Sequence, residues 1–199
     1  MSAKNARRAE VDYTTKETST QLVLSLDGKG TARIDTGIAF LDHMLEQLTF
    51  HGLFDLELKC QGDLQNDSHH TVEDVAIALG RALDQALGPR QGIRRYGACH
   101  LPMDETLARA VLDFSGRPEF HFQASFAQPR LGTLETQMIG HFFKSLAVAA
   151  RLTLHLAVLY GENDHHKCEA LFKACGRALC EAVTPDPRRS GVSSTKGVL

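Results

Sequence analysis

A nineteen-residue segment occurs twice in this chain, and this repeat constrains the fold more than any other feature. Residues 69–87, HHTVEDVAIALGRALDQAL, align without a gap with residues 165–183, HHKCEALFKACGRALCEAV. Nine of the nineteen positions are identical, among them both histidines, the glutamate and the whole GRAL segment. Because self-similarity at a fixed separation is typical of a duplicated supersecondary unit, the chain is expected to form two related halves.

The sequence upstream of each copy extends the repeat. A strand-like alternation of apolar residues precedes each copy, and before that strand apolar residues recur at helical spacing. The alternating residues are Phe54, Leu56, Leu58 and Cys60 in the first half, and Leu152, Leu154, Leu156, Val158 and Tyr160 in the second. The helical positions are Leu41, Met44, Leu45 and Leu48 in the first half, and Phe142, Leu146 and Ala149 in the second.

Each half also has room for three short strands before its first helix. They are expected near 8–14, 21–26 and 31–35, and near 94–102, 106–113 and 119–126. The sequence therefore predicts an α+β fold of tandem βββαβα repeats, with the helices of the two halves packed together and the sheets outside. We expect one pseudo-symmetric domain over 1–199, with repeat one at about 7–90, a hinge at 88–92, repeat two at about 93–183 and a C-terminal tail at 184–199.

The charge and the cysteine content argue against several classes of partner and environment. A net charge of −2 gives no electrostatic reason to expect nucleic acid or an acidic membrane surface. No apolar run approaches the roughly 18–20 residues that span a bilayer. The five cysteines are an odd number without CxxC spacing, which favours reduced thiols in a cytoplasmic protein over a disulfide framework.

The repeated histidine pairs have the spacing of metal ligands. In a helix, His69 and Glu73 lie on one face because they are four residues apart, and the same holds for His165 and Glu169. Adjacent histidines diverge by about 100° around the helix axis, so one pair cannot easily bind a single ion. The two pairs therefore indicate two metal sites, each of which takes one histidine from each pair.

This geometry predicts the composition of the two sites. One ion takes His69, Glu73 and His166, and the other takes His165, Glu169 and His70. His43 and His141 in the upstream helices complete two sets of three histidines and one glutamate, but spacing does not say which histidine joins which set. The eight side chains can meet within one chain or across a subunit interface. Imidazole and carboxylate ligands without thiolate suit manganese, iron or catalytic zinc.

Several segments are similar to one known family. The chain contains FLDHMLEQLTFHGLFDLELKCQGDL, SHHTVEDVAIALGRAL, GIRRYG, PMDETL, DFSGRP, YGENDHHKCEALFKACGRAL and SSTKGVL. These segments resemble imidazoleglycerol-phosphate dehydratases, enzymes of histidine biosynthesis, over nearly the whole chain from about residue 7. Two departures are small: Ser68 stands where aspartate is common, and Ser193 stands where the family usually has proline.

The resemblance implies a composition for each metal site and for the assembly. It implies two Mn²⁺ ions per active site and a homo-oligomer of 24 subunits with active sites between subunits. Carried over to this sequence, one ion is bound by His43, His70, His165 and Glu169, and the other by His69, Glu73, His141 and His166.

The resemblance also implies a reaction and its site residues. The expected reaction is dehydration of imidazoleglycerol phosphate to imidazoleacetol phosphate, with Glu17 and Glu169 as catalytic residues. The expected substrate-binding residues are Glu17, His43, Gln47, Arg95, Arg117, Lys173, Ser194, Thr195 and Lys196. Two other functions fit the ligand pattern: an assembly protein in which the ions only join subunits, and a two-metal phosphate-ester hydrolase. The hydrolase predicts more bridging carboxylates than the sequence offers.

Overall fold

A computed structural model describes residues 7–199, and its elements follow the predicted repeat. The first half contains β1 (Arg8–Thr14), β2 (Thr18–Ser25), β3 (Ala32–Asp35), α1 (Ala39–Gly52), β4 (Asp55–Gly62) and α2 (His69–Leu87). The second half contains β5 (Tyr96–Met103), β6 (Thr106–Asp113), β7 (Glu119–Gln123), α3 (Gln137–Ala149), β10 (Thr153–Tyr160) and α4 (Asp164–Val183). Each half is thus a βββαβα unit, as the sequence predicts.

The two larger sheets of the described chain have the same topology. Their strand orders are β1-β2-β4-β3 and β5-β6-β10-β7, so the first, second, fourth and third strand of each half follow one another. In each sheet the last pair is parallel and the other two pairs are antiparallel. This shared topology confirms the tandem βββαβα repeat that the sequence predicts.

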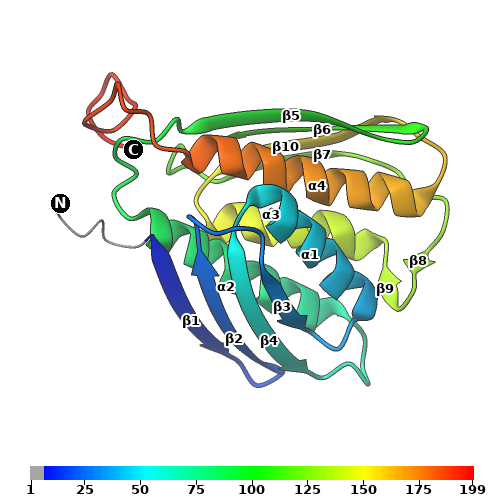
Figure 1. Cartoon of the computed structure of the whole chain (residues 1–199). Helices are drawn as coiled ribbons and strands as arrows, with labels where there is room; N and C mark the ends of the chain where they lie inside the picture. Colours follow the sequence, from blue (N-terminus) through cyan, green and yellow to red (C-terminus); the bar gives the residue numbers. More distant parts are fainter. Residues whose placement is uncertain (1–6) are drawn as a thin grey trace.

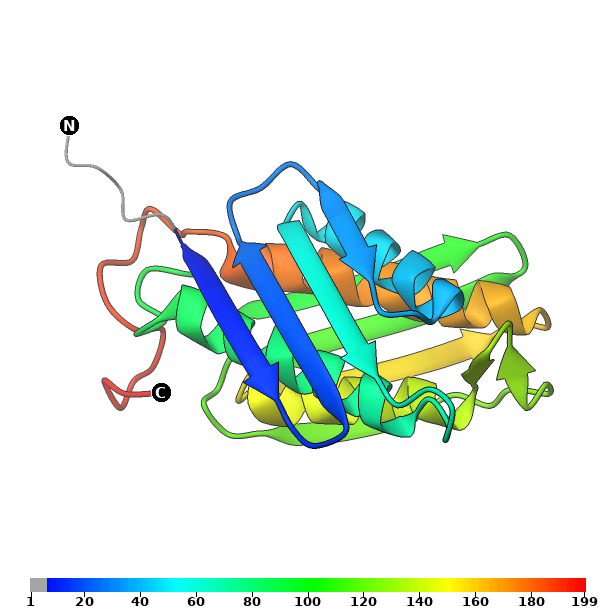
Figure 2. The same ribbon diagram turned by 90° about the horizontal axis from the view of Figure 1, so that it is seen from below.

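The sheets form the outer layers and the helices lie between them (Figure 1). In the view of Figure 2 the sheet of the first half covers α2 and part of α1. Each helix also packs against the other half, since α1 contacts α4 and α2 contacts α3. The buried apolar side chains of both halves form one continuous core. The predicted packing of the helices is therefore confirmed.

The repeated GRAL segment places a glycine at each of these helix crossings. A Cβ on Gly176 of α4 would lie 2.4 Å from the carbonyl oxygen of Leu48 in α1. A Cβ on Gly80 of α2 would lie 2.6 Å from the Cβ of Ala149 in α3. Since neither distance leaves room for a side chain, glycine permits the close approach of the helices. The same residue thus serves the same crossing in both halves.

The apolar alternations predicted for β4 and β10 hold except at one end. Phe54, Leu56, Leu58 and Cys60 are all buried. Leu152, Leu154 and Leu156 are buried too, but the prediction for Tyr160 is wrong, because this side chain is 63% exposed. The pairing of β10 with β6 shifts register between Val158 and Tyr160. A bulge of this kind changes the face to which the following residues point.

One element has no counterpart in the predicted repeat. Before α3, the strands β8 (Arg130–Leu131) and β9 (Leu134–Glu135) form a two-stranded hairpin. The expected strand at 119–126 is shorter, since β7 ends at Gln123. The chain between Gln123 and α3 therefore forms a loop and hairpin of the second half alone.

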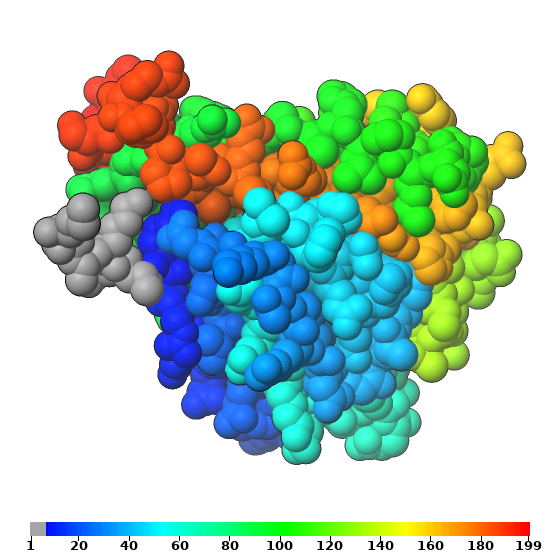
Figure 3. Space-filling model, in the orientation of Figure 1, coloured from blue at the N-terminus to red at the C-terminus, as the bar shows by residue number. Residues whose placement is uncertain are grey.

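The C-terminal tail packs against the linker between the halves. Gln91 pairs with Val192, and Ile93 pairs with Pro185, in isolated β-bridges. The tail forms a projection at one end of the molecule in Figure 3, at the opposite end from the β8–β9 hairpin in Figure 1. Among residues 7–199, no helix combines the length and apolar character needed to span a membrane. All five cysteines have free thiols, as the sequence predicts.

Candidate metal centres

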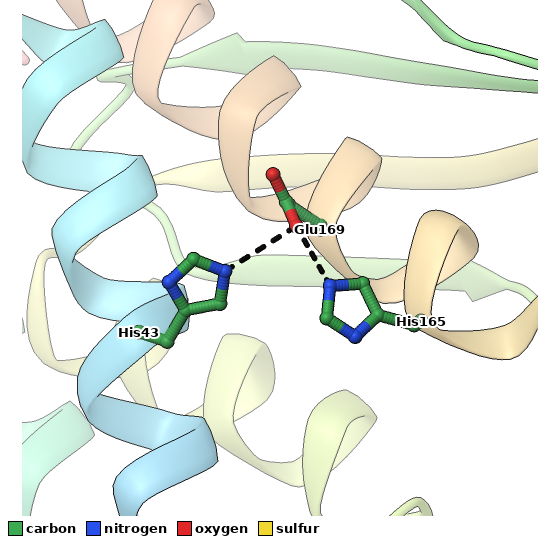
Figure 4. A group of neighbouring side chains, drawn as sticks. All are labelled: His43, His165 and Glu169. Carbon is green, nitrogen blue, oxygen red and sulfur yellow. Dashed lines mark hydrogen bonds and ion pairs between the residues drawn. The ribbon is translucent and has the colours of Figure 1, made fainter.

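The crossing of α1 and α4 brings together a histidine of the first half with a histidine and a glutamate of the second (Figure 4). Glu169 Oε2 lies 2.9 Å from His165 Nε2 and 3.4 Å from His43 Nε2. His165 and Glu169 are one helical turn apart on α4, and His43 reaches them from the second turn of α1. The ligand atoms of the three side chains lie within 4.8 Å of one another, which is a suitable spacing around a single ion.

Lys173 holds the other oxygen of the same glutamate. Its Nζ lies 2.5 Å from Glu169 Oε1, so Oε2 alone faces the two histidines. Burial favours the neutral acid, but hydrogen bonds from Lys173 and His165 lower the pKa of the Glu169 carboxyl. The carboxylate is therefore the favoured form, and it is the form that binds a metal ion.

The crossing of α2 and α3 repeats this arrangement. Glu73 lies between two histidines, with Oε2 at 3.5 Å from His69 Nε2 and Oε1 at 3.4 Å from His141 Nε2. These ligand atoms also lie within 4.8 Å of one another. Within the described chain, His141 Nε2 is buried and makes no hydrogen bond. A buried polar atom without such a partner is costly, and a bound cation would satisfy it.

Both groups therefore fit a divalent transition metal by donor type and by geometry. Each offers two imidazole nitrogens and one carboxylate, donors that suit manganese, iron or catalytic zinc. Three protein ligands leave further coordination positions free, as in metal sites that carry out chemistry. Each group combines both halves of the chain, because helices of opposite halves cross at each group.

His70 and His166 lie outside these two groups and have other partners. His70 Nδ1 lies 3.1 Å from Asp63 Oδ2, and His166 Nδ1 lies 2.7 Å from Glu105 Oε2. The hydrogen bond from His166, with those of nearby backbone N–H groups, lowers the pKa of the Glu105 carboxyl well below its usual range. Each predicted set of four ligands is thus represented by three residues here, while its fourth histidine points elsewhere.

The helices that carry the histidine pairs begin in similar ways. Asp67 accepts a hydrogen bond from the backbone N–H of His69, and Asn163 accepts one from that of His165. The segment around the β8–β9 hairpin then contacts both helix starts. Ser68 hydrogen-bonds to Glu135, and Asp164 accepts a bond from the backbone N–H of Gln128. The second-half hairpin therefore links the two histidine pairs.

Five of the predicted substrate-binding residues lie around a cavity of about 490 Å³ beside the tail. They are Arg95, Arg117, Ser194, Thr195 and Lys196, and Arg189 also lines the cavity. Arg95 is buried. It donates two hydrogen bonds to Asp113 and a third to the Ser193 carbonyl oxygen. It therefore fixes the tail in place, and the cavity remains lined by cations and hydroxyl groups suited to an anion.

Comparison with known proteins identifies the family. The family model described as imidazoleglycerol-phosphate dehydratase matches residues 36–179. An imidazoleglycerol-phosphate dehydratase of Chloroflexus aggregans is 59% identical over 98% of this chain and 96% of its own length. The chain belongs to the imidazoleglycerol-phosphate dehydratase family.

Solved structures of the family support the same conclusion. The enzyme from Staphylococcus aureus subsp. aureus aligns with a TM-score of 0.81 and 39% identity, covering 89% of this chain and 99% of that one. The enzyme from Pyrococcus furiosus aligns with a TM-score of 0.82 and 33% identity, covering 95% of this chain and 100% of that one. The tandem fold described above is therefore the fold of this family.

The remaining residues that family resemblance predicts lie away from the tail cavity. Gln47 is one turn after His43 on α1, and Lys173 is bound to Glu169 on α4. Glu17 lies in the turn between β1 and β2, where its charge contributes to raising the pKa of His70 behind the larger effect of Asp63. The described chain thus separates the predicted substrate-binding residues into several groups.

Sequence reasoning did not single out Asp63 or Glu105. Both lie within segments on which the family resemblance rests, QGDL and PMDETL. Asp63 is seven positions from His70 but lies outside the helix that carries this histidine, and Glu105 is 61 positions from His166. The pairing depends on where the β5–β6 turn lies relative to α4, so only the folded chain reveals it.

Proposed function

We propose that the chain catalyses the metal-dependent dehydration of imidazoleglycerol phosphate to imidazoleacetol phosphate in histidine biosynthesis, as a hydro-lyase with two Mn²⁺ ions per active site. Family membership supports the reaction, since the relatives carry that enzyme name. The observation that carries the metal requirement is the pair of matching groups, each with two histidines and one glutamate. The unsatisfied, buried Nε2 of His141 supports it further.

The proposed ligands form two sets related by the repeat. One ion is held by His43, His70, His165 and Glu169, and the other by His69, Glu73, His141 and His166. When bound, the ions supply Lewis acidity to the substrate ring and chain. Because Lys173 pairs with Glu169 Oε1, the carboxylate presents only Oε2 to the ion. The catalytic role of Glu169 is to hold this ion.

The positions of the proposed residues support an active site shared between subunits. The tail cavity lies at the C-terminal end of α4, where the Arg95 backbone N–H bonds to the Ala182 carbonyl oxygen. Glu169 is thirteen residues earlier on that helix, hence about 20 Å away at 1.5 Å per residue. Because a small phosphate ester cannot easily bridge this separation, we propose that the tail of one subunit serves the metal ligands of another. The family resemblance implies that the homo-oligomer has 24 subunits, and we propose this number for the assembly.

We propose Glu17 as the general base of the reaction. Its carboxylate accepts a proton from a chain carbon of the substrate as the hydroxyl group on the neighbouring carbon departs. The departing hydroxyl takes up a proton to form water, which balances the proton that Glu17 holds and later releases, and the resulting enol becomes the ketone. Glu17 is exposed on the β1–β2 turn, and its charge contributes, behind the effect of Asp63, to raising the pKa of His70. Glu17→Gln is expected to lower turnover sharply with metal content unchanged, and retained activity rules out the role.

The deciding experiment is an assay with imidazoleglycerol phosphate. The protein is treated with EDTA, and Mn²⁺ is then added back. We expect loss of dehydration with EDTA and recovery with Mn²⁺. Failure to recover any dehydration with Mn²⁺ contradicts the proposal. Release of inorganic phosphate in place of dehydration indicates a hydrolase, and loss of assembly without any turnover indicates that the ions only join subunits.

A further inference from the structure

The six proposed histidine ligands fall into two classes by the ring nitrogen that faces a carboxylate of the chain. His43, His69, His141 and His165 direct Nε2 towards the glutamate of their group. His70 and His166 instead have Nδ1 beside a carboxylate that belongs to neither group. These two carboxylates, Asp63 and Glu105, have no role in the proposed function. The contacts of Asp63 and Glu105 are therefore independent of the observations that support the proposed function.

Glu105 is held firmly in the position from which it contacts His166. It lies at the turn between β5 and β6, and its Oε1 accepts hydrogen bonds from the backbone N–H groups of Asn163 at 2.8 Å and Glu162 at 3.1 Å. The Thr106 hydroxyl donates a third, at 3.0 Å. With Oε1 fixed to the segment that precedes α4, Oε2 is left to contact His166 Nδ1 at 2.7 Å.

Asp63 has the corresponding relationship to His70. Its two oxygens lie 3.2 and 3.1 Å from His70 Nδ1, and the Asn66 side-chain amide donates to Oδ2 at 2.6 Å. Asp63 follows β4 directly and precedes α2, whereas Glu105 reaches α4 from a different hairpin. The two halves therefore achieve the same contact with residues at positions that the repeat does not relate.

A carboxylate on Nδ1 determines which nitrogen of the ring can bind a metal ion. A carboxylate only accepts hydrogen bonds, so the imidazole must carry its proton on Nδ1. The lone pair is then on Nε2, which is the atom available to the ion. The Nε2 of His166 lies 3.7 Å from Asp104 Oδ2, which is beyond hydrogen-bond distance, and the His166 side chain is 25% exposed. Nε2 is thus directed away from the group that holds the ring.

We propose that Glu105 is a positioning residue that fixes the tautomer and orientation of His166 for metal binding through Nε2, and that Asp63 does the same for His70. All six histidines then bind through the same nitrogen. This inference rests on the proposed metal-dependent function. A simple ion pair that only stabilises the helix start predicts instead a loss of fold stability without a specific effect on metal affinity.

Glu105→Gln tests the inference with almost no change of shape. Its amide oxygen can still accept the backbone bonds of Asn163 and Glu162, but the amide nitrogen in place of Oε2 is a donor. Nδ1 of His166 must then accept, so the proton moves to Nε2 and the metal-binding lone pair is lost. We expect Mn²⁺ affinity, measured by calorimetric titration of metal-stripped protein, to fall about 10–100-fold.

Three further measurements show whether the effect on Mn²⁺ affinity is specific to the contact between Glu105 and His166. Glu162→Gln removes an equal charge from the neighbouring loop before α4 and is expected to leave Mn²⁺ affinity unchanged. The melting temperature of metal-free Glu105→Gln is expected to stay within about 3 °C of the wild type, a change under about 1 kcal/mol. In a His166→Ala background, Glu105→Gln is expected to have no further effect on Mn²⁺ affinity, because Glu105 acts through that ring.

The results distinguish this inference from the proposed function. Wild-type protein that binds Mn²⁺ while Glu105→Gln binds it equally well overturns the positioning role. A loss of affinity that persists in the His166→Ala background overturns it as well, since the effect then passes through the fold. Wild-type protein that binds no Mn²⁺ contradicts the proposed function itself, and the inference falls with it.

Discussion

His43 Nε2 lies 3.4 Å from Glu169 Oε2, although the two residues belong to opposite halves of the chain. The contact exists because α1 of the first half crosses α4 of the second. The same crossing in the other pair of helices brings His141 to Glu73. The duplication therefore does more than double the fold: each candidate metal group requires both copies.

Glu169→Gln is expected to remove one of the two ions bound per subunit and to lower turnover more than about a hundredfold. Mutation of a residue that only hydrogen-bonds to a metal ligand already lowers metal affinity or activity about 10–100-fold, and Glu169 is a proposed ligand itself. The neutral amide keeps the shape but loses the charge that faces His43 and His165. Elemental analysis after dialysis measures the metal content. Glu162→Gln, an exposed glutamate on the preceding loop, is the matched control. Two ions per subunit in dialysed Glu169→Gln protein contradict the assignment.

Gly176→Ala is expected to lower the free energy of unfolding by about 1–3 kcal/mol, because the added Cβ meets the Leu48 carbonyl oxygen at 2.4 Å. Intrinsic helix propensity alone favours alanine over glycine by about 1 kcal/mol. A loss of stability in Gly176→Ala would therefore have to come from the helix crossing. Denaturant unfolding of metal-free protein measures the change.

Gly191→Ala provides the comparison, because the described residues leave its Cβ position open to 4 Å. We expect this control to change stability by less than about 0.5 kcal/mol. Since α1 and α4 also carry His43 and His165, Gly176→Ala is expected to weaken Mn²⁺ binding too. A variant as stable as the wild type refutes the close crossing.

The sequence predicts the parts of the molecule that depend on local periodicity or on the repeat. The facing of His165 and Glu169 follows from helical spacing, and both sit on α4 as expected. The partner of each upstream histidine does not follow from spacing, because it depends on which helices cross. Helical spacing does not assign His43 or His141 to a set, and only the family resemblance implies an assignment. In the folded chain His43 lies beside His165 and Glu169, and His141 lies beside His69 and Glu73.

The failures have the same physical origin. Tyr160 continues the apolar alternation of β10, but a bulge that depends on the pairing with β6 turns it outward. The strands of the β8–β9 hairpin have two residues each, which is too short for an alternation of apolar and polar residues to be recognised. The contact of Glu105 with His166 joins a turn to a helix 61 residues away. Long-range pairing decides each of these features.

The stability of the metal-free protein is expected to show a contribution from Asp55 that disappears in acid. Its Oδ1 accepts hydrogen bonds from the backbone N–H groups of Lys29 and Thr31, both at 2.9 Å. These bonds, led by the one from Lys29, lower the pKa of the Asp55 carboxyl from its ordinary value of 3.8. Because the folded pKa is the lower one, the contribution is complete above the unfolded value and is lost as pH falls through the folded value.

Urea unfolding of the wild type and Asp55→Asn at a series of pH values measures this contribution. The difference in unfolding free energy is expected to be constant near neutrality and to shrink below about pH 5. Ser25→Ala, which alters the residue paired with Asp55 across the sheet, controls for the β2–β4 ladder. A difference that stays constant down to the acid transition excludes a role for the ionised carboxylate.

Arg117→Met is expected to raise KM for the phosphate substrate about 10–100-fold, since a hydrogen bond to a charged group is worth about 1.5–3 kcal/mol. Arg117 lines the cavity beside the tail together with Lys196. This cavity lies near the C-terminal end of α4, whereas Glu169 is the sixth residue of that helix. Loss of Arg117 is therefore expected to leave bound metal unchanged. Steady-state kinetics and elemental analysis separate the two effects.

Deletion of residues 190–199 tests the same cavity more severely, because it removes Ser194, Thr195 and Lys196 together. We expect a larger rise in KM than for Arg117→Met, again with both ions retained. Arg188→Met is the control: its side chain is 87% exposed and pairs with Asp186, outside the cavity lining. An unchanged KM in the deletion variant shows that the tail does not bind the phosphate. Loss of metal in Arg117→Met contradicts the separation of the cavity from the metal ligands along α4.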